Sequence, residues 1–286
     1  MTDSSSSATE LNPSTPTGLP SLDDAIRGGF KPEQLALLAG PTGAGKSALA
    51  SQIALFASEW AAANNQGDVL YFSYEMSVSD LTTRLLIQAT RGLRDGYHMP
   101  AGWSGRDRPL IEAAREKINA LPLRITEAGA HDYLSLEVEI SNNMQARGRR
   151  PALVVVDHLG LVGSANPGSD EEIRERVVRG LKEMARELKV PILALGQFTR
   201  RADLKNPDNR PNLSYLRGSS AIESAAHLVL LLHAPYIYLH DAEERKRLVA
   251  SGARVNLIVA KNRSGTTTEI ELEWIGPQLI FRELPR

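Results

Sequence analysis

The chain has 286 residues, a formal net charge of −1 and no cysteine. This length allows one large α/β domain or two small ones, and the balanced charge excludes a global basic field for nucleic acid. The lack of cysteine excludes disulfides and thiolate metal sites, which suits a cytoplasmic location. No apolar run approaches the ~20 residues of a membrane span, and the N-terminus has no signal-peptide pattern, so we expect no membrane contact.

The first segment, residues 1–16, is rich in serine, threonine and proline and has no apolar periodicity. Such a composition predicts a disordered tail. Order is then expected over residues 17–286. It should begin with a short helix that Ser21 caps and that ends at Gly28 and Gly29.

A phosphate-binding loop is predicted next, because eight residues match the pattern G-x-x-x-x-G-K-[ST] at every fixed position. They are Gly40, Pro41, Thr42, Gly43, Ala44, Gly45, Lys46 and Ser47. Residues 35–39 predict a buried strand before the loop, and residues 47–57 predict a helix after it. In this context the loop amides point at phosphate oxygens, Lys46 neutralises the β- and γ-phosphates, and the Ser47 hydroxyl ligates Mg²⁺. The sequence therefore predicts a nucleotide-binding protein.

Helical and strand patterns alternate along the rest of the chain. Helices are predicted over residues 79–88, 109–120, 135–147 (capped by Ser135) and 171–189. Strands are predicted over residues 68–75, 123–125, 151–157, 191–197, 228–232, 255–261, 268–274 and 278–282, while residues 92–108 are an unassigned loop. The alternation predicts an α/β fold with a mostly parallel central sheet flanked by helices, and with an antiparallel hairpin at the C-terminus.

Three polar residues end predicted strands, where ligands bind in parallel sheets. Asp157 is expected to hold Mg²⁺ opposite Ser47, with an ordinary turn aspartate as the alternative. Glu75 is a candidate to orient or deprotonate an attacking water, and Gln197 a candidate to sense the γ-phosphate by hydrogen bonding. For the last two, the pattern alone supports an ordinary loop residue nearly as well.

Two basic segments follow. Residues 261–265 are expected to form a basic turn whose Arg263 is a candidate to meet transition-state charge in a neighbouring subunit, although the pattern alone favours a solvated β-turn. Residues 198–220 form an unusually long connection with five basic residues against two acids, which suits either a phosphate backbone or a plain surface loop. The five basic residues are Arg200, Arg201, Lys205, Arg210 and Arg217.

The order of these pieces resembles the C-terminal RecA-like motor domain of DnaB-type replicative helicases, the superfamily 4 hexameric helicases. The matching segments are residues 17–23 with Gly28 and Gly29, then 40–47, 72–77, 154–159, 195–197, 210–219, 222–223 and 258–265. The likeness covers nearly all of the chain from Thr17 onward. Its Glu-Met-Ser and Lys-x-Arg-x-Gly pieces, in this order, are more specific than the phosphate loop alone.

The resemblance implies a RecA-like P-loop NTPase fold and an ATP-dependent, ring-forming helicase or translocase that acts on single-stranded DNA in replication. It implies Mg²⁺ as the partner of ATP. It further implies that Glu75 is the catalytic base, that Asp157 is the Mg²⁺-associated acid and that Gln197 is the γ-phosphate sensor.

The resemblance also implies a homo-oligomer, expected to be a hexamer, with ATP sites between subunits. Lys261 and Arg263 would reach the nucleotide of the adjacent subunit, Arg263 as the arginine finger. The loop around Arg217, with Gly218 and Ser219, would line the central channel and hold single-stranded DNA.

The chain departs from the family pattern in three places. DnaB-type proteins usually carry an N-terminal helical domain and a linker helix, whereas only a short tail precedes Thr17, so ring stability and the contact with a primase or loader stay open. His158 replaces the tyrosine common in bacterial members and is closer to phage-type relatives. Gly218 stands where a glutamate often follows the arginine of the DNA loop.

Two other functions remain as alternatives. A non-unwinding RecA-like DNA-dependent ATPase, such as a recombination mediator, loader or regulatory ring, would use the same phosphate-loop residues. A small-molecule P-loop kinase would use residues 200–217 as a lid, transfer phosphate to an added acceptor and have no need of Lys261 and Arg263 in trans.

Overall fold

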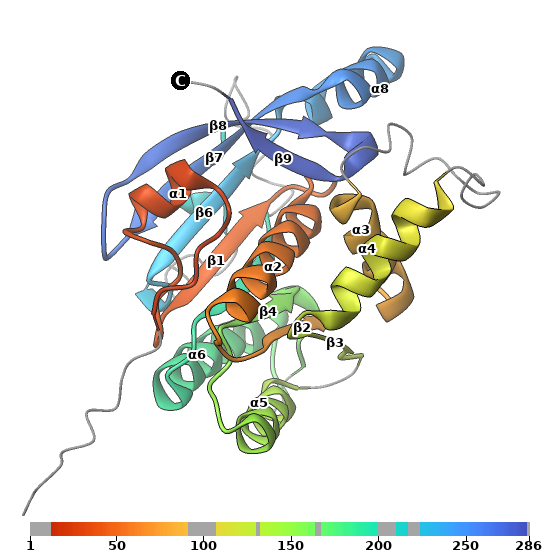
Figure 1. Ribbon diagram of the computed structural model, residues 1–286. Coiled ribbons are helices and arrows are strands. Elements are labelled where there is room, and N and C mark those ends of the chain that lie inside the picture. Colours follow the sequence, from red (N-terminus) through yellow and green to blue (C-terminus); the bar gives the residue numbers. More distant parts are fainter. Residues whose placement is uncertain are drawn as a thin grey trace, which may run out of the picture.

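A computed structural model describes residues 13–90, 107–129, 132–163, 167–198, 210–216 and 224–284. In this part of the chain a single sheet of nine strands has the order β3-β2-β4-β5-β1-β6-β7-β8-β9 (Figure 1). The strands are β1 Leu35–Gly40, β2 Val69–Ser73, β3 Leu123–Glu127, β4 Leu153–Asp157, β5 Ile192–Gln197, β6 Leu228–His233, β7 Ala253–Asn262, β8 Thr268–Ile275 and β9 Ile280–Glu283. Strands β1 to β6 pair in parallel and β7 to β9 are antiparallel, which confirms the mostly parallel sheet and the C-terminal hairpin.

Helices cover both faces of the sheet (Figure 1). They are α1 Pro20–Ala25, α2 Lys46–Ala63, α3 Val78–Ala89, α4 Arg108–Ala120, α5 Tyr133–Arg147, α6 Asp170–Leu188 and α8 Ala242–Ser251, with short 3₁₀ turns at η1 Leu159–Leu161, η3 Leu213–Tyr215, η4 Pro235–Tyr238 and η5 Gly276–Gln278. Alternate residues of β1 enter two separate cores: Ala36 and Leu38 pack with α1 and α2, while Leu35 and Leu37 pack with α5 and α6. Because both faces are covered, β1 is apolar and buried throughout.

The strand ends form two opposite edges of the sheet, one at the carboxyl ends of the parallel strands and one at their amino ends. In register, Gly40 pairs with Gln197 and Ser73 pairs with Asp157, so the carboxyl ends of β1, β5, β2 and β4 meet at one edge. Asn262, at the end of the antiparallel strand β7, instead pairs with Leu228 at the start of β6. The turn that follows β7 therefore lies at the opposite edge, beside the start of β1.

Three local predictions need correction. The expected boundary at residue 16 lies too late, because Thr15 pairs with Phe30 and its hydroxyl donates to the Ala152 carbonyl oxygen at 2.5 Å. Ser21 does not cap α1; its backbone N–H and its hydroxyl both bond the Glu283 carboxylate at 2.8 Å. The contacts of Thr15 and Ser21 join distant segments, so local sequence patterns do not reveal them. Ser135 is not the cap of α5 either.

The cap of α5 is Asp132, whose carboxylate accepts hydrogen bonds from the Ser135 backbone N–H and hydroxyl. The pattern placed the cap three residues too late because serine and aspartate are both good caps. Helix α8 was not predicted at all. It has no buried residue and a capping aspartate, Asp241, and its sequence lacks the apolar stripe from which a surface helix is recognised.

Candidate nucleotide-binding site

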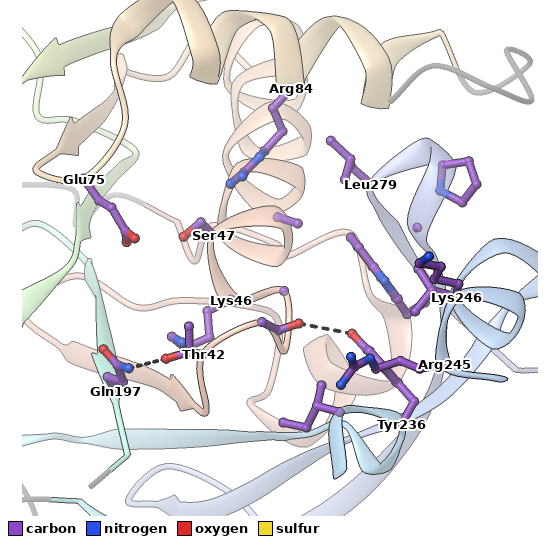
Figure 2. A pocket seen from close by; sticks show the side chains of 18 of the residues that line it. Thr42, Lys46, Ser47, Glu75, Arg84, Gln197, Tyr236, Arg245, Lys246 and Leu279 are labelled. Atoms are coloured by element: carbon purple, nitrogen blue, oxygen red, sulfur yellow. Dashed lines mark hydrogen bonds between the residues drawn. The ribbon is translucent and has the colours of Figure 1, made fainter. Parts of the chain in front are cut away.

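A cavity of about 860 Å³ opens above the carboxyl ends of the parallel strands (Figure 2). Its floor is the predicted phosphate loop, which leads from β1 into α2 through Gly45. Gly45 has φ +91°, and a Cβ atom there would lie 2.8 Å from Cζ of Phe281. Only glycine meets both demands, so the loop backbone can turn its amides toward the cavity and the start of α2.

Lys46 is the buried cation of the loop. Its ammonium donates a hydrogen bond to the Pro41 carbonyl oxygen at 3.0 Å. Burial lowers the pKa of Lys46, and the charges of Asp157 and Glu75 oppose this by favouring the protonated form. Lys46 is thus a desolvated positive charge between two carboxylates and the loop, a setting in which a phosphate would be attracted strongly.

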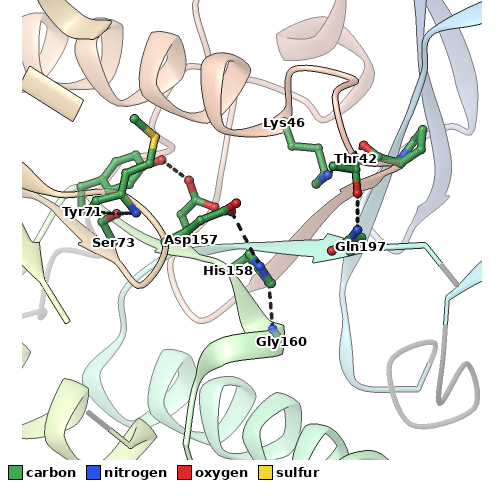
Figure 3. A network of polar contacts seen from close by, with 11 residues as sticks. Thr42, Lys46, Tyr71, Ser73, Asp157, His158, Gly160 and Gln197 are labelled. Atoms are coloured by element: carbon green, nitrogen blue, oxygen red, sulfur yellow. Dashed lines mark hydrogen bonds and ion pairs between the residues drawn. The ribbon is translucent and has the colours of Figure 1, made fainter. Parts of the chain in front are cut away.

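Asp157 ends β4 beside this lysine and lines the same cavity as Ser47. The residue is 2% exposed, and the hydroxyl of Tyr71 donates a hydrogen bond to its Oδ2 atom at 2.8 Å (Figure 3). In the described part of the chain, no group of three or more His, Cys, Asp or Glu side chains could hold a metal ion by itself. A carboxylate and a hydroxyl do fit Mg²⁺, because this ion usually takes one or two protein oxygens and completes its shell with phosphates and water.

Glu75 follows β2, and its side chain is 60% exposed toward the cavity. Its Oε2 atom lies 3.7 Å from Nε2 of His158, whose Nδ1 accepts a hydrogen bond from the Gly160 backbone N–H at 3.1 Å (Figure 3). An Nδ1 that accepts leaves Nε2 to carry the proton and to face Glu75. His158 can therefore orient a carboxylate that still has access to water.

Gln197 ends β5, and its amide donates a hydrogen bond to the Thr42 hydroxyl in the phosphate loop (Figures 2 and 3). Figure 2 shows Gln197 and Glu75 on one side of the loop and Tyr236, Arg245 and Lys246 on the other. The structure thus gathers eight predicted site residues in one cavity: Thr42, Gly43, Gly45, Lys46, Ser47, Glu75, Asp157 and Gln197.

Several residues of the cavity were missed by the sequence analysis. Arg84 extends from α3 toward the cavity (Figure 2), and its Nη1 atom is buried without a hydrogen-bond partner in the described part of the chain. Arg84 lies nine residues after Glu75, on helix α3. This closeness to a candidate catalytic acid in the sequence could have marked Arg84 as a candidate site residue. An unpaired buried guanidinium nitrogen that lines a phosphate-loop cavity suits an anionic ligand.

The other missed residues form the far side of the cavity, opposite Gln197. The Tyr236 hydroxyl donates to the Gly43 carbonyl oxygen at 3.3 Å, and burial raises the pKa of Tyr236 to about 12. Further residues come from η4, α8 and the β8–β9 hairpin: Ile237, Arg245, Lys246, Val249, Ala250, Trp274, Pro277 and Leu279. This side is largely apolar and aromatic, with two cations from α8. No local motif marks it, because it is assembled from three segments.

Lys261 and Arg263 are not part of this cavity. The Arg263 backbone N–H donates to the His227 carbonyl oxygen at 3.0 Å, and its guanidinium donates to the Ser224 carbonyl oxygen at 2.8 Å. The turn around Arg263 is held by Asn262, whose amide bonds the carbonyl oxygens of Ala25 and Thr266. Arg263 is exposed at the sheet edge where β1 begins, so it does not serve the phosphate loop of its own chain.

The expected DNA-binding residues are mostly outside the described residues: Arg200, Arg201, Lys205, Arg217, Gly218 and Ser219. Arg210 is described, and its guanidinium pairs with the Glu269 carboxylate on β8. Among the described helices, no candidate meets the length and apolarity that a membrane crossing requires.

The sheet order, the phosphate loop at the carboxyl end of β1 and the acids on neighbouring strands define a P-loop nucleotide-binding domain. A family model for the DnaB-like helicase C terminal domain matches residues 14–283. The chain therefore belongs to the DnaB-like helicase C-terminal domain family.

Relatives and solved structures agree. The chain is 33% identical over 275 residues to the replicative DNA helicase DnaB of Leifsonia xyli subsp. xyli (strain CTCB07). This match covers 94% of this chain and 56% of the relative. The DnaB of Geobacillus stearothermophilus is 28% identical over 284 residues, which covers 95% of this chain and 57% of the relative. The chain thus spans little more than half the length of these relatives.

Two solved structures superpose with a TM-score of 0.83. One is the ATPase domain of G40P, at 26% identity and with coverage of 98% of this chain and 94% of that one. The other is a DnaB-like replicative helicase, studied with its interactions with primase, at 25% identity and with coverage of 98% and 64%. These matches confirm the RecA-like ATPase fold.

Proposed function

We propose that this chain is the motor of an ATP-dependent, ring-forming helicase or translocase that moves along single-stranded DNA in replication. The observation that carries the proposal is the division of the site. The phosphate loop, Glu75, Asp157 and Gln197 share one cavity, whereas Arg263 lies at the opposite edge of the sheet. A site whose arginine lies at the opposite edge of the sheet suits an assembly in which each subunit supplies the arginine for its neighbour's site.

Within one subunit, the loop amides, Lys46 and Arg84 hold the triphosphate. Ser47 and Asp157 hold Mg²⁺, which neutralises phosphate charge when bound. The apolar side of the cavity, with Trp274 and Pro277, receives the base. Such an orientation places the γ-phosphate on the side of the loop where Glu75 and Gln197 lie (Figure 2).

Glu75 is proposed to accept the proton of the attacking water. Its exposed side chain has room for that water, and the His158 ring beside it fixes its direction. Gln197 is placed to detect the γ-phosphate because its amide already contacts Thr42 of the loop. When phosphate takes over that hydrogen bond, the end of β5 changes its partner.

The end of β5 is joined to the basic segment proposed to hold DNA. Phe198, next to Gln197, forms a β-bridge with Leu216, and its ring packs edge-on against Tyr215 with ring centroids 6.0 Å apart. These contacts join the two described ends of the segment in which Arg200, Arg201 and Lys205 stand in the sequence. A change at Gln197 is therefore expected to reach both ends of that segment, which supports coupling between nucleotide state and DNA contact.

The proposal that Arg263 acts on the nucleotide of a neighbouring subunit rests on a distance within the chain. Arg263 lies beside the start of β1, and the phosphate loop follows its end, so the six residues of β1 separate them by roughly 20 Å. That span exceeds the reach of an arginine side chain. A ring in which this edge faces the next subunit's cavity brings Arg263 and Lys261 to the neighbour's phosphates. A hexamer in the cytoplasm that contacts a primase or loader is the form that the family suggests.

A mixing experiment tests the shared site. Glu75→Gln and Arg263→Ala chains should each be nearly inactive as ATPases, because every site lacks one group. In a mixture, an Arg263→Ala subunit still supplies Glu75 and a Glu75→Gln subunit still supplies Arg263. An interface that joins these two residues is complete, so activity should reappear. Arg115→Ala, an exposed arginine on α4, is the matched control and should leave activity unchanged.

The outcomes separate the alternatives. Recovery on mixing together with stimulation by single-stranded DNA and strand separation supports the helicase. Recovery and DNA stimulation without strand separation indicates the non-unwinding DNA-dependent ATPase. An Arg263→Ala chain with full activity and phosphate transfer to an added acceptor would instead indicate a kinase and would contradict the proposal.

A further inference from the structure

Tyr71 on β2 is a buried phenol whose only described side-chain hydrogen bond goes to the acid at the end of β4. It is 2% exposed, and its hydroxyl donates to Oδ2 of Asp157 at 2.8 Å (Figure 3). None of the sequence motifs includes this tyrosine. Because the acid it contacts lines the nucleotide cavity, the role of the hydroxyl needs an explanation.

The contact follows from strand register. Tyr71 is paired with Val155 and Ser73 with Asp157 across the parallel strands β2 and β4. Side chains two residues apart on neighbouring strands share a face, and the diagonal distance of about 7–8 Å is within reach of an aromatic side chain. The backbone is fixed as well, because the Tyr74 N–H donates to the Asp157 carbonyl oxygen at 2.7 Å. A shift of one residue would break the contact.

The hydrogen bond divides the two oxygens of the carboxylate. In the described part of the chain, the Tyr71 hydroxyl is the one hydrogen-bond donor recorded for the Asp157 side chain. It occupies Oδ2, and no donor to Oδ1 is found in that part of the chain. Asp157 lines the same cavity as Ser47, so the second oxygen is left for a ligand there. A buried carboxylate without any donor would carry a large desolvation cost and would be free to rotate.

The tyrosine acts on this site through the carboxylate. Its hydroxyl donates to Oδ2 of Asp157, and Tyr71 is not among the residues that line the cavity, whereas Asp157 is. Its role is therefore to orient the acid that lines the cavity.

We propose that Tyr71 is a positioning residue that holds the Asp157 carboxylate in the rotamer that binds the divalent cation of the nucleotide. The inference rests on the proposed role of Asp157 and adds a determinant of metal affinity to it. Partners that orient a metal ligand typically contribute about 10- to 100-fold to metal affinity. Removal of the hydroxyl should therefore weaken the cation and leave the phosphate loop intact.

The test is a titration of Mn²⁺ in the presence of ADP, with free Mn²⁺ followed by electron paramagnetic resonance. Tyr71→Phe should weaken Mn²⁺ about 10-fold or more, while ADP affinity without metal stays unchanged. Tyr74→Phe is the matched control, because the buried hydroxyl of this half-buried residue has no hydrogen-bond partner in the described part of the chain. It should bind Mn²⁺ like the parent chain.

Each remaining outcome has a definite meaning. If Tyr71→Phe binds Mn²⁺ within twofold of the parent while Asp157→Asn binds it poorly, the positioning role is wrong and the proposed function stands. If Asp157→Asn itself leaves Mn²⁺ affinity unchanged, the assigned role of Asp157 fails. If Tyr71→Phe loses ADP binding without metal, Tyr71→Met replaces it in the test. Methionine fills the space with a flexible apolar chain, and its Mn²⁺ affinity is compared with that of the parent chain in the same way.

Discussion

The Lys46 ammonium lies 3.0 Å from the carbonyl oxygen of Pro41, five residues earlier in the same loop. The Pro41 carbonyl therefore serves as a hydrogen-bond acceptor for an ammonium group that burial has partly desolvated. A phosphate oxygen is a better partner for this cation than a neutral carbonyl, because both members of the pair are then charged. Binding of a triphosphate is expected to exchange one partner for the other.

Lys46→Ala tests this exchange. Hydrogen bonds to charged groups contribute about 1.5–3 kcal/mol, so nucleotide affinity should fall roughly 10- to 100-fold. The melting temperature without nucleotide should change little, since the lost partner is a carbonyl that water can satisfy. Isothermal titration with ATP measures the effect, and Lys31→Ala provides a lysine control away from the cavity. Equal affinity in the two variants would contradict the assigned role.

Arg84→Ala tests the arginine that the sequence patterns did not reveal. Its Nη1 atom is buried without a hydrogen-bond partner in the described part of the chain, so its removal deletes a charge-assisted contact to phosphate and no hydrogen bond that this nitrogen makes there. ATP affinity is expected to fall by about 10-fold or more. The same variant should not lower thermal stability. If affinity is retained and stability falls, Arg84 is structural.

His227 makes stability depend on pH. Burial, followed by the charges of Arg263, Lys182 and Lys261, lowers the pKa of His227 below its ordinary value of 6.5. The unfolded chain therefore takes up a proton near pH 6.5 that the folded chain accepts only at lower pH. The contribution of His227 to stability is thus lost as the pH falls below about 6.5.

Thermal unfolding between pH 5 and pH 7.5 measures this dependence. His227→Gln should flatten the decline in melting temperature on the acid side, because glutamine does not titrate. His240→Gln changes an exposed histidine and should leave the decline as it is in the parent chain. Identical curves for both variants would show that His227 does not cause the slope.

Asp68 separates structural acids from those of the site. Its side chain is 7% exposed and bonds Arg147 at 3.0 Å, Arg124 at 3.3 Å and Asn143 at 3.0 Å, which ties β2 to β3 and α5. Loss of one partner of a buried ion pair costs about 3–5 kcal/mol, and the half-exposed arginines place this case at the lower end.

Asp68→Ala should therefore lower the free energy of unfolding by about 3 kcal/mol in urea titrations, with ATP affinity unchanged where the protein is folded. Glu112→Ala breaks an exposed pair with Arg108 on α4 and should cost less than about 1 kcal/mol. An affinity loss in Asp68→Ala under native conditions would place this acid in the functional network instead.

Much of the fold was predictable because its signals are local. The apolar run of β1, the glycine spacing of the loop and the helix of α2 follow one another within about 30 residues, and each obeys a period that can be read directly. The positions of Asp157 and Gln197, which end β4 and β5, and of Glu75, which follows β2, were predictable as well, since parallel strands carry their carboxyl ends to one edge.

The amino-acid sequence by itself determined the class of fold, the phosphate loop and the carboxylates near it, because periodicity and motif spacing act over short distances. Tertiary structure decided the rest. The contacts Tyr71–Asp157 and Ser21–Glu283 join residues 86 and 262 positions apart, and both depend on strand register and packing. Arg84 reaches the cavity only because α3 packs against α2, and Arg263 reaches the opposite edge of the sheet only because the antiparallel β7 carries it there.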